Sequence, residues 1–274
     1  MDHLVPSQVD AVLAQFGFAA APAADRAGLD AVYGAWCRQV PFDNAIKRID
    51  LAAGTAPFRN DTPAEFFALW LAHGVGGTCW PSSRALGALL AALGFDIRLG
   101  SAAMADEFVG PVHSHGTVLA RVGGELLWVD SSMLTDVPVV LRVGEATSLA
   151  HPVRPVRVEP LDDLWRVHWT SGARPGEMGC RLLADDVDGD HYSARYEWSR
   201  ANSPFNGGLY ATTNRADHVL SLAGGRRIVL DAAGATASEP LAAAARRALL
   251  VEEFGYSEAI VDALPDDDPI PPLA

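Results

Sequence analysis

The spacing of apolar residues along this chain changes at Gly94. Before Gly94, apolar residues recur three and four positions apart, which is the spacing of one face of a helix. After Gly94 they alternate with polar residues, which is the spacing of a half-buried strand. The pattern therefore predicts helices, then a β layer, then a mixed α/β piece, an order that belongs to the α+β class.

The predicted elements follow from this spacing and from the residues that end each segment. Helices are predicted at Ser7–Phe16, at Leu29–Val40, after the capping box Thr62-Pro63-Ala64-Glu65, and at Pro81–Leu93. The segment from about residue 96 to 200 is predicted to be mostly β, with strands at Thr117–Val122, Leu126–Asp130, Val137–Val143, Arg181–Leu183 and His191–Ser199. The last two strands flank Asp188-Gly189, which is typical of a hairpin turn. Beyond a break at Asn202–Phe205 we expect a strand around Arg227–Leu230 and helices at Pro240–Phe254 and Ser257–Leu264.

Composition limits the setting and the partners of the chain. Its 274 residues are 49% apolar, which is ample material for a core. The formal net charge of −13 argues against nucleic acid and acidic membrane surfaces as partners, because both are anionic. The longest apolar stretch, Ala85–Leu93, is far shorter than the ~20 residues of a membrane span. The 3 scattered cysteines form no disulfide framework and no zinc motif, so a cytoplasmic setting is expected.

Lys47 is the only lysine of the chain. Because this lysine lies in Ile46-Lys47-Arg48 and the chain has no other, a GxxxxGK phosphate-binding loop is excluded. It also leaves a Schiff-base mechanism only one candidate, on a stretch typical of an ordinary loop or helix edge, so that mechanism is not favoured.

Cys79 is the first candidate for chemistry. It lies in Gly76-Gly77-Thr78-Cys79-Trp80-Pro81-Ser82, a glycine turn directly before a predicted helix. The N–H groups and positive dipole end of a helix N-terminus favour an anion, so a thiol at this place is expected to have a lowered pKa and to be a nucleophile. The alternative is that a cysteine beside Trp80 simply fills the core.

The register of one hairpin brings a histidine and an aspartate together. The segment Val122-Gly123-Gly124-Glu125 predicts a two-residue turn. Counting back along both strands from this turn places His115 and Asp130 on one face of the sheet as diagonal neighbours. Asp130 can then fix the tautomer of His115 and leave its other ring nitrogen to act as a base. Cys79, His115 and Asp130 are therefore the predicted catalytic residues.

Three competing interpretations are less favoured. His113 shares the face of His115, but no carboxylate follows opposite it until Asp136. The two histidines could form half of a metal site, but no spacing supplies further ligands, so no metal is predicted. The acidic stretch Asp186–Asp190 fails the calcium-loop pattern, because its glycine falls at position four instead of six.

In the order of these motifs, the chain resembles the arylamine N-acetyltransferase family. Val40-Pro41-Phe42-Asp43-Asn44 is similar to the family's Pro-Phe-Glu-Asn segment, Gly76–Trp80 to its Gly-Gly-x-Cys-aromatic turn, and Leu127–Asp130 to its Trp-Leu-Val-Asp strand. The Asp188-Gly189 hairpin, the Asn202–Phe205 turn and the segment Glu252–Gly255 match the later layout. The resemblance covers nearly the whole chain.

The resemblance implies a fold and a reaction. It implies a helical bundle with the cysteine (1–95), an antiparallel β-barrel with the histidine and aspartate (96–200) and an α/β lid (201–274). It also implies that an acyl group passes from a thioester, usually acetyl-CoA, to Cys79 and then to an amine, hydrazine or hydroxylamine, with His115 as base and acid. The expected partners are thus a thioester donor and a small amine acceptor, with no tightly bound cofactor. The expected substrate-binding residues are Phe42, Trp80, Met133 and Phe205.

Two stretches depart from the family pattern. Trp80-Pro81-Ser82-Ser83 stands where the family has aromatic-Glu-x-Asn, and Ser131-Ser132-Met133 follows Asp130 where the family has Val-Gly-Phe-Gly. Acyl transfer is therefore better supported than an arylamine acceptor or acetyl-CoA itself. Two alternatives stay open: a thiol hydrolase or transglutaminase-like amidase with the same three residues, and a non-catalytic binding protein on this fold.

Overall fold

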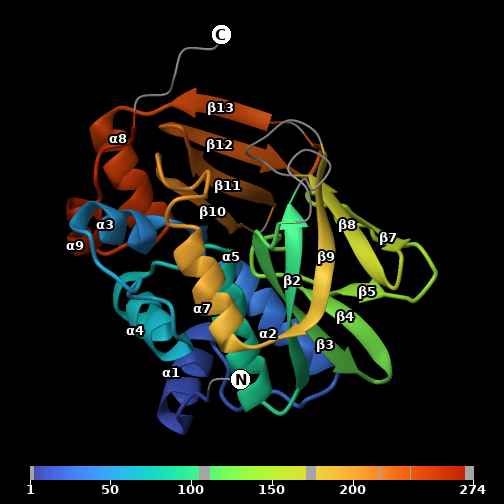
Figure 1. Ribbon diagram of the computed structural model, residues 1–274. Helices are drawn as coiled ribbons and strands as arrows, with labels where there is room; N and C mark the ends of the chain where they lie inside the picture. The colour runs from blue at the N-terminus through green and yellow to red at the C-terminus, as the bar shows by residue number, and fades with distance from the viewer. Residues whose placement is uncertain (1–2, 105–111, 171–176, 216, 235, 269–274) are drawn as a thin grey trace.

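The computed structural model of the chain describes residues 3–104, 112–170, 177–215, 217–234 and 236–268. Figure 1 shows the N-terminal helices at the lower left, one sheet on the right and a second sheet at the top. In the described part of the chain, no helix is both long enough and apolar enough to cross a membrane.

The first third of the chain is helical, as predicted. Its helices are α1 (Pro6–Phe16), α2 (Arg26–Gln39), α3 (Ala45–Ala53), α4 (Pro63–His73) and α5 (Cys79–Ala92). The predicted capping box begins α4, where Thr62 and Glu65 bond each other's backbone N–H groups. Helix α5 begins at Cys79, two residues before the predicted start, because Thr78 has extended backbone and is the N-cap. Helix α3, around Lys47, was expected only as a loop or helix edge.

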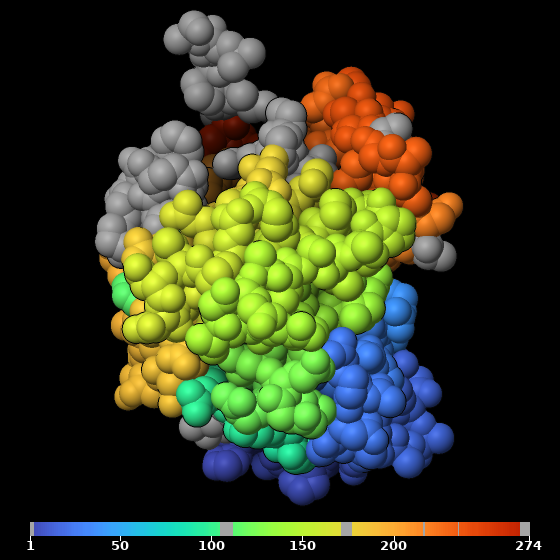
Figure 2. All heavy atoms as spheres, turned by 90° about the vertical axis from the view of Figure 1, so that its right-hand side faces the viewer, coloured from blue at the N-terminus to red at the C-terminus, as the bar shows by residue number. Residues whose placement is uncertain are grey.

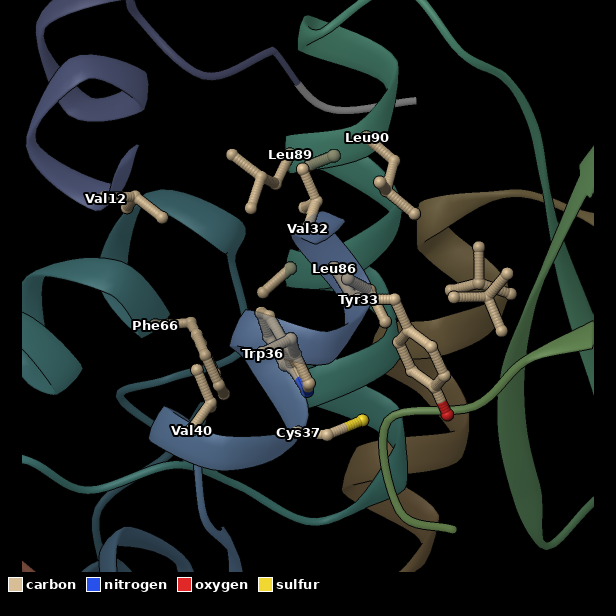
Figure 3. Packing of buried hydrophobic residues seen from close by; sticks show 14 of the residues in the cluster. Val12, Val32, Tyr33, Trp36, Cys37, Val40, Phe66, Leu86, Leu89 and Leu90 are labelled. Atoms are coloured by element: carbon tan, nitrogen blue, oxygen red, sulfur yellow. The ribbon is translucent and has the colours of Figure 1, made fainter. Parts of the chain in front are cut away.

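An aromatic cluster joins these helices. Figure 3 shows side chains of α1, α2, α4 and α5 meeting around Trp36. The Trp36 ring stacks on Phe66 at 5.8 Å between centroids and meets Phe67 edge-on at 6.1 Å. Also on α2, the buried Tyr33 hydroxyl donates to the backbone oxygen of Asp130 at 2.7 Å. The helical core is therefore bonded directly to the end of the strand that carries the predicted aspartate.

An eight-stranded antiparallel sheet forms the central barrel, as expected. Its strands are β2 (Asp96–Met104), β3 (His115–Val122), β4 (Glu125–Val129), β5 (Val139–Leu141), β6 (Thr147–Leu149), β7 (Val156–Leu161), β8 (Leu164–Thr170) and β9 (Glu177–Val187), in the order β5-β4-β3-β2-β9-β8-β7-β6. The edge strands β5 and β6 approach each other, and the Thr147 hydroxyl donates to the Val140 carbonyl, so the sheet nearly closes. Trp128, Trp165 and Trp169 lie in its buried interior. Figure 2 shows the outer surface of these strands between the N-terminal region in blue and the C-terminal sheet in orange.

The hairpin predicted at Asp188-Gly189 is wrong. The dipeptide begins helix α7 (Gly189–Trp198) instead, and the Asp188 carboxylate accepts a hydrogen bond from the His191 N–H at 2.8 Å. An aspartate before a helix satisfies a free N–H group in this way, so the same two residues serve as a helix start. Tyr192 and Tyr196, four residues apart, form the buried face of α7, where Tyr192 meets Trp80 of α5 and Tyr196 meets Phe58.

The C-terminal region forms a five-stranded antiparallel sheet with helices beside it. The sheet order is β1 (Phe42–Asp43), β10 (Tyr210–Asn214), β11 (His218–Ala223), β12 (Arg226–Asp231) and β13 (Thr236–Pro240). The predicted strand around Arg227–Leu230 is confirmed as β12, and the predicted helices are present as α8 (Ala243–Ala248), a π-helix (Leu249–Glu253) and α9 (Glu258–Ala263). The predicted domain limits at residues 95 and 200 stay a prediction. Strand β1 lies before the first limit and pairs with β10, which lies after the second.

Candidate active site

Two glycines hold the turn that presents Cys79. The N–H of Gly76 donates to the Asp43 carboxylate at 2.7 Å, and the N–H of Asp43 donates to the Gly77 carbonyl at 3.1 Å. A Cβ at Gly76 would lie 1.8 Å from the Pro41 oxygen, so only glycine allows this approach of the two backbones. Strand β1 and the turn are thereby locked together, and Cys79 is fixed as the first residue of α5.

Asp43 is a supporting residue that the sequence indicated only through the resemblance. It is fully buried, and burial raises the pKa of its carboxyl group to about 6, although the N–H groups of Gly76 and Ala45 donate to it. A carboxyl group close to Cys79 is thus engaged by the backbone and holds the turn in place.

His115 and Asp130 form a buried pair. His115 Nε2 lies 2.8 Å from Asp130 Oδ2, and the two residues are 4% and 0% exposed. The predicted hairpin register is present, with Val122 opposite Glu125 and Val118 opposite Val129. Continuing this register brings Asp130 to the side of the sheet on which His115 lies, which is how the sequence placed them.

The Asp130 carboxylate has a donor for each of its oxygens. Oδ1 accepts the N–H groups of Ser132 and Met133 at 2.9 and 3.1 Å and the Ser132 hydroxyl at 2.5 Å. Oδ2 accepts the Trp128 indole N–H at 3.2 Å in addition to the histidine. Burial acts to raise the pKa of Asp130, but the interactions with His115 and Ser132 outweigh it and hold the pKa well below its usual range. Asp130 is therefore an anion fixed in one orientation.

His115 links this carboxylate to Cys79. Burial acts to lower the pKa of His115, but its interactions with Asp130 and with the Cys79 side chain outweigh burial and raise the pKa to about 10. Because Asp130 occupies Nε2, Nδ1 is the nitrogen left to exchange a proton with the sulfur. Cys79 Sγ also lies 3.9 Å from the Ser114 carbonyl oxygen. The structure thus brings the three residues together in the order that the sequence predicted.

Stability should depend on pH through His115. Its pKa of about 10 exceeds the ordinary value of 6.5, so the folded protein holds a proton that the unfolded chain releases. We expect the free energy of unfolding to fall between pH 6.5 and 8, by up to about 1.4 kcal/mol per pH unit. The pKa of Lys47, lowered to about 8 by burial, adds the opposite slope above pH 8, so the window ends there.

Urea unfolding at several pH values between 6.5 and 8 measures this slope. In Asp130→Asn, only the Cys79 side chain opposes the effect of burial on His115, and the slope should become much shallower. If the free energy of unfolding depended on pH equally in wild type and variant, the His115–Asp130 pair would not be what holds the extra proton.

Ser83 and Ser131 connect the two halves of the site. Ser83 Oγ donates to the Gly116 carbonyl at 2.8 Å and lies 2.8 Å from Ser131 Oγ. Ser83 belongs to α5, one turn after Cys79, and Ser131 directly follows Asp130. The two stretches in which the sequence departs from the family pattern are therefore bonded to each other.

His113 lies outside this arrangement. Its Nδ1 is 2.7 Å from Ser101 Oγ, and the same hydroxyl is 3.0 Å from His191 Nε2. It contacts no carboxylate in the described part of the chain. In that part, no group of three His, Cys, Asp or Glu side chains is placed to hold a metal ion.

Cys79 and His115 open into a cavity of about 430 Å³. Three of the predicted substrate-binding residues, Phe42, Trp80 and Phe205, line it. Met133 does not, because its side chain is buried in the barrel core while Ser132 faces the cavity. The hydrogen bond from Met133 N–H to Asp130 turns the backbone so that these neighbouring side chains diverge.

Among the cavity residues that the sequence reasoning missed, two are cationic. Lys47 and Arg154 both line the cavity. The sequence drew attention to Lys47 because it is the only lysine of the chain. The position of its side chain, however, follows only from its place on helix α3 in the structure. Arg154 lies in an irregular segment between β6 and β7, where periodicity gives no signal.

Comparisons with known proteins identify the fold. No family model and no curated protein matches the chain. Among solved structures, the arylamine N-acetyltransferase from M. tuberculosis matches with a TM-score of 0.79 at 20% identity, over 94% of this chain and 100% of that one. The enzyme from Salmonella typhimurium matches with a TM-score of 0.79 at 16% identity, over 95% and 98% of the two chains.

A third solved structure was determined with a ligand. The arylamine N-acetyltransferase from Mycobacterium marinum in complex with CoA matches with a TM-score of 0.75 at 19% identity, over 92% of this chain and 94% of that one. Identities this low establish the fold alone. This chain therefore has the arylamine N-acetyltransferase fold over nearly its whole length, with a sequence that has diverged far from those of the solved structures.

Proposed function

We propose that the chain is an N-acyltransferase that forms an amide through an acyl-cysteine intermediate. The observation that carries this proposal is the contact of the His115 ring with both Asp130 and Cys79 at the mouth of a cavity. A thiolate at a helix N-terminus beside an imidazolium is an activated nucleophile.

In the first step, the Cys79 thiolate attacks the carbonyl carbon of an acyl thioester. The carbon–sulfur bond of the donor breaks, and the departing thiolate takes the proton from His115. In the second step, an amine attacks the acyl-cysteine and His115 removes a proton from it. The bond to Cys79 breaks, and the thiolate–imidazolium pair is restored. Asp130 keeps the ring in one orientation through both steps.

The donor in this proposal is an acyl thioester such as acyl-CoA, used as a co-substrate. Its support is the fold shared with proteins of which one was solved with CoA. The walls formed by Phe42, Trp80 and Phe205 suit an apolar acyl or amine group.

The first test is intact mass measurement after incubation with a panel of acyl thioesters. We expect the wild-type mass to increase by one acyl group and the Cys79→Ala mass to stay unchanged. The other two cysteines, Cys37 and Cys180, are buried, and burial raises the pKa of Cys37, so they provide internal controls. An identical adduct on Cys79→Ala would contradict the proposal.

A second measurement separates transfer from hydrolysis. Thioester consumption is followed with and without an amine, together with the amide product. We expect consumption to rise with amine concentration and the amide to account for it. Equal turnover without amine would favour a hydrolase with the same three residues.

A further inference from the structure

The described lining of the cavity beside Cys79 contains cations and no acids. Among the described residues that line it, Lys47, Arg154 and His115 are the only ones that can carry charge as cations, and none is Asp or Glu. The whole chain, in contrast, has 34 Asp and Glu against 21 Lys and Arg. His115 already has its carboxylate partner in Asp130. The other two cations need a different explanation.

Lys47 is almost completely buried, with 2% of its surface exposed. Its ammonium group donates to the carbonyl and hydroxyl oxygens of Ser199 at 3.2 and 2.8 Å, and these acceptors are neutral. In the described part of the chain, no carboxylate forms an ion pair with it. The ammonium group also lies 5.9 and 6.0 Å from the ring centroids of Phe58 and Tyr196. It has three donors, and none of these contacts supplies a negative charge.

Arg154 is also buried, with 3% of its surface exposed. One terminal nitrogen donates to the Met133 carbonyl at 2.8 Å and the other to the Thr212 hydroxyl at 3.2 Å. Its Nε is buried and has no hydrogen-bond partner among the described residues. Asp136 acts on this charge electrostatically, but no carboxylate among the described residues forms an ion pair with it. Burying a cation without a directly bonded counter-charge is costly, so this guanidinium has unused capacity for an anion.

The position of Lys47 limits which anion fits. Lys47 and Cys79 line the same cavity, and Cys79 acts on the Lys47 charge, so an anion bound by Lys47 belongs to the part of the substrate near the reacting carbonyl. The phosphates of CoA are separated from the thioester by the whole pantetheine arm and do not meet this requirement. The aromatic side chains on the walls, beside these cations, instead suit a small organic acid.

We propose that Lys47 and Arg154 bind a carboxylate of the substrate in the acyl transfer proposed above. The carboxylate belongs either to the far end of a dicarboxylic acyl group or to an acid-bearing amine. Both sources present the same chemistry to the two cations. This inference rests on the proposed function and names its substrate class.

Kinetics with matched substrates test the inference and identify the source. N-acetylcysteamine thioesters serve as donors, because they carry no phosphate. The donor pair is the glutaryl thioester and its methyl ester, and the acceptor pair is 3-aminobenzoate and its methyl ester. We expect the wild type to prefer the free acid in one pair, and Lys47→Met or Arg154→Met to reduce that preference by about 30-fold or more. Arg121→Met, a change at an exposed arginine of β3, is the matched control.

The preference ratio distinguishes binding from a structural role. Loss of the Lys47–Ser199 bonds would lower kcat/KM for both members of a pair alike, whereas loss of a carboxylate partner affects only the acid. Lys47→Arg should recover part of the preference, since it keeps the charge. A wild type that acylates Cys79 with neutral esters but shows no preference in either pair would overturn this inference and leave the proposed function standing. If no thioester acylates Cys79, both are overturned.

A direct measurement does not depend on turnover. Because Lys47 is the only lysine, selective ¹³C labelling of the lysine ε-carbon gives one side-chain signal. In Cys79→Ala, we expect 3-aminobenzoate or glutarate to shift this signal saturably and the methyl esters to leave it in place. Equal shifts with acid and ester would contradict a carboxylate site.

Discussion

Asp130→Asn is expected to lower thioester turnover by about 10³- to 10⁴-fold at pH 7. The side-chain oxygen of asparagine can keep the bonds that Oδ1 accepts from the backbone of Ser132 and Met133. Its amide group then faces His115 and can only donate, so Nε2 of the histidine must become an acceptor. The ring proton moves to Nδ1, the nitrogen that has to accept the proton of Cys79, and the base is blocked.

The control for this variant is the same chemical change elsewhere. Asp188→Asn alters the N-cap of α7, where aspartate and asparagine are nearly equivalent, and should keep turnover close to wild type. Turnover of Asp130→Asn is measured with a thioester and an amine, at a temperature where circular dichroism shows the variant folded. A loss smaller than tenfold would mean that Asp130 does not set the tautomer of the base.

Gly76→Ala is expected to destabilise the protein by more than about 4 kcal/mol. The added Cβ would lie 1.8 Å from the Pro41 oxygen and 3.0 Å from the Pro41 carbonyl carbon, and both are backbone atoms that cannot rotate away. Relief requires β1 and the glycine turn to separate, which breaks the bonds from Asp43 to both glycines. Urea unfolding measures the loss.

Gly179→Ala is the matched control. Gly179 lies in β9, and its Cβ would meet only the His168 ring, at 3.5 Å or more, which is ordinary contact. This variant should change the free energy of unfolding by less than about 1 kcal/mol. If Gly76→Ala were equally stable, the turn would be freer than the structure shows.

The paired residues of the site could be predicted from the sequence because one local turn determines their register. Gly123-Gly124 fixes the pairing of β3 and β4, and counting along two strands then places His115 beside Asp130. Cys79 was identified by the glycine turn and the helix that follows it. These features involve short stretches of chain, in which spacing alone determines geometry.

The prediction of α7 failed for a physical reason. An Asp-Gly pair suits both a hairpin turn and a helix start, and the residues that follow decide between them. Tyr192 and Tyr196 have helical spacing, but after an Asp-Gly pair the segment His191–Ser199 also suits the second strand of a hairpin. Their burial depends on contacts with Trp80 and Phe58, which lie more than one hundred positions earlier in the chain.

The polar lining of the cavity could not be predicted from the sequence either. Lys47 meets Ser199, and Arg154 meets Thr212, across long separations in the chain. No periodicity signals such contacts, because they arise only when the three parts of the chain come together. Met133 was placed in the cavity by its position after Asp130, yet one backbone turn directs it into the barrel.

The Ser83–Ser131 bond has a consequence for how a sequence like this can evolve. Each hydroxyl is buried, and Ser131 finds its described partner in Ser83. Exchanging Ser83 alone for an apolar residue would strand the Ser131 hydroxyl away from water, which costs about 1–3 kcal/mol. An intermediate with Ser131 alone is thus less stable, whereas Ser83 alone keeps its bond to the Gly116 carbonyl. We therefore expect serine at position 131 to depend on serine at position 83, so that the divergence around the carboxylate did not precede that around the nucleophile.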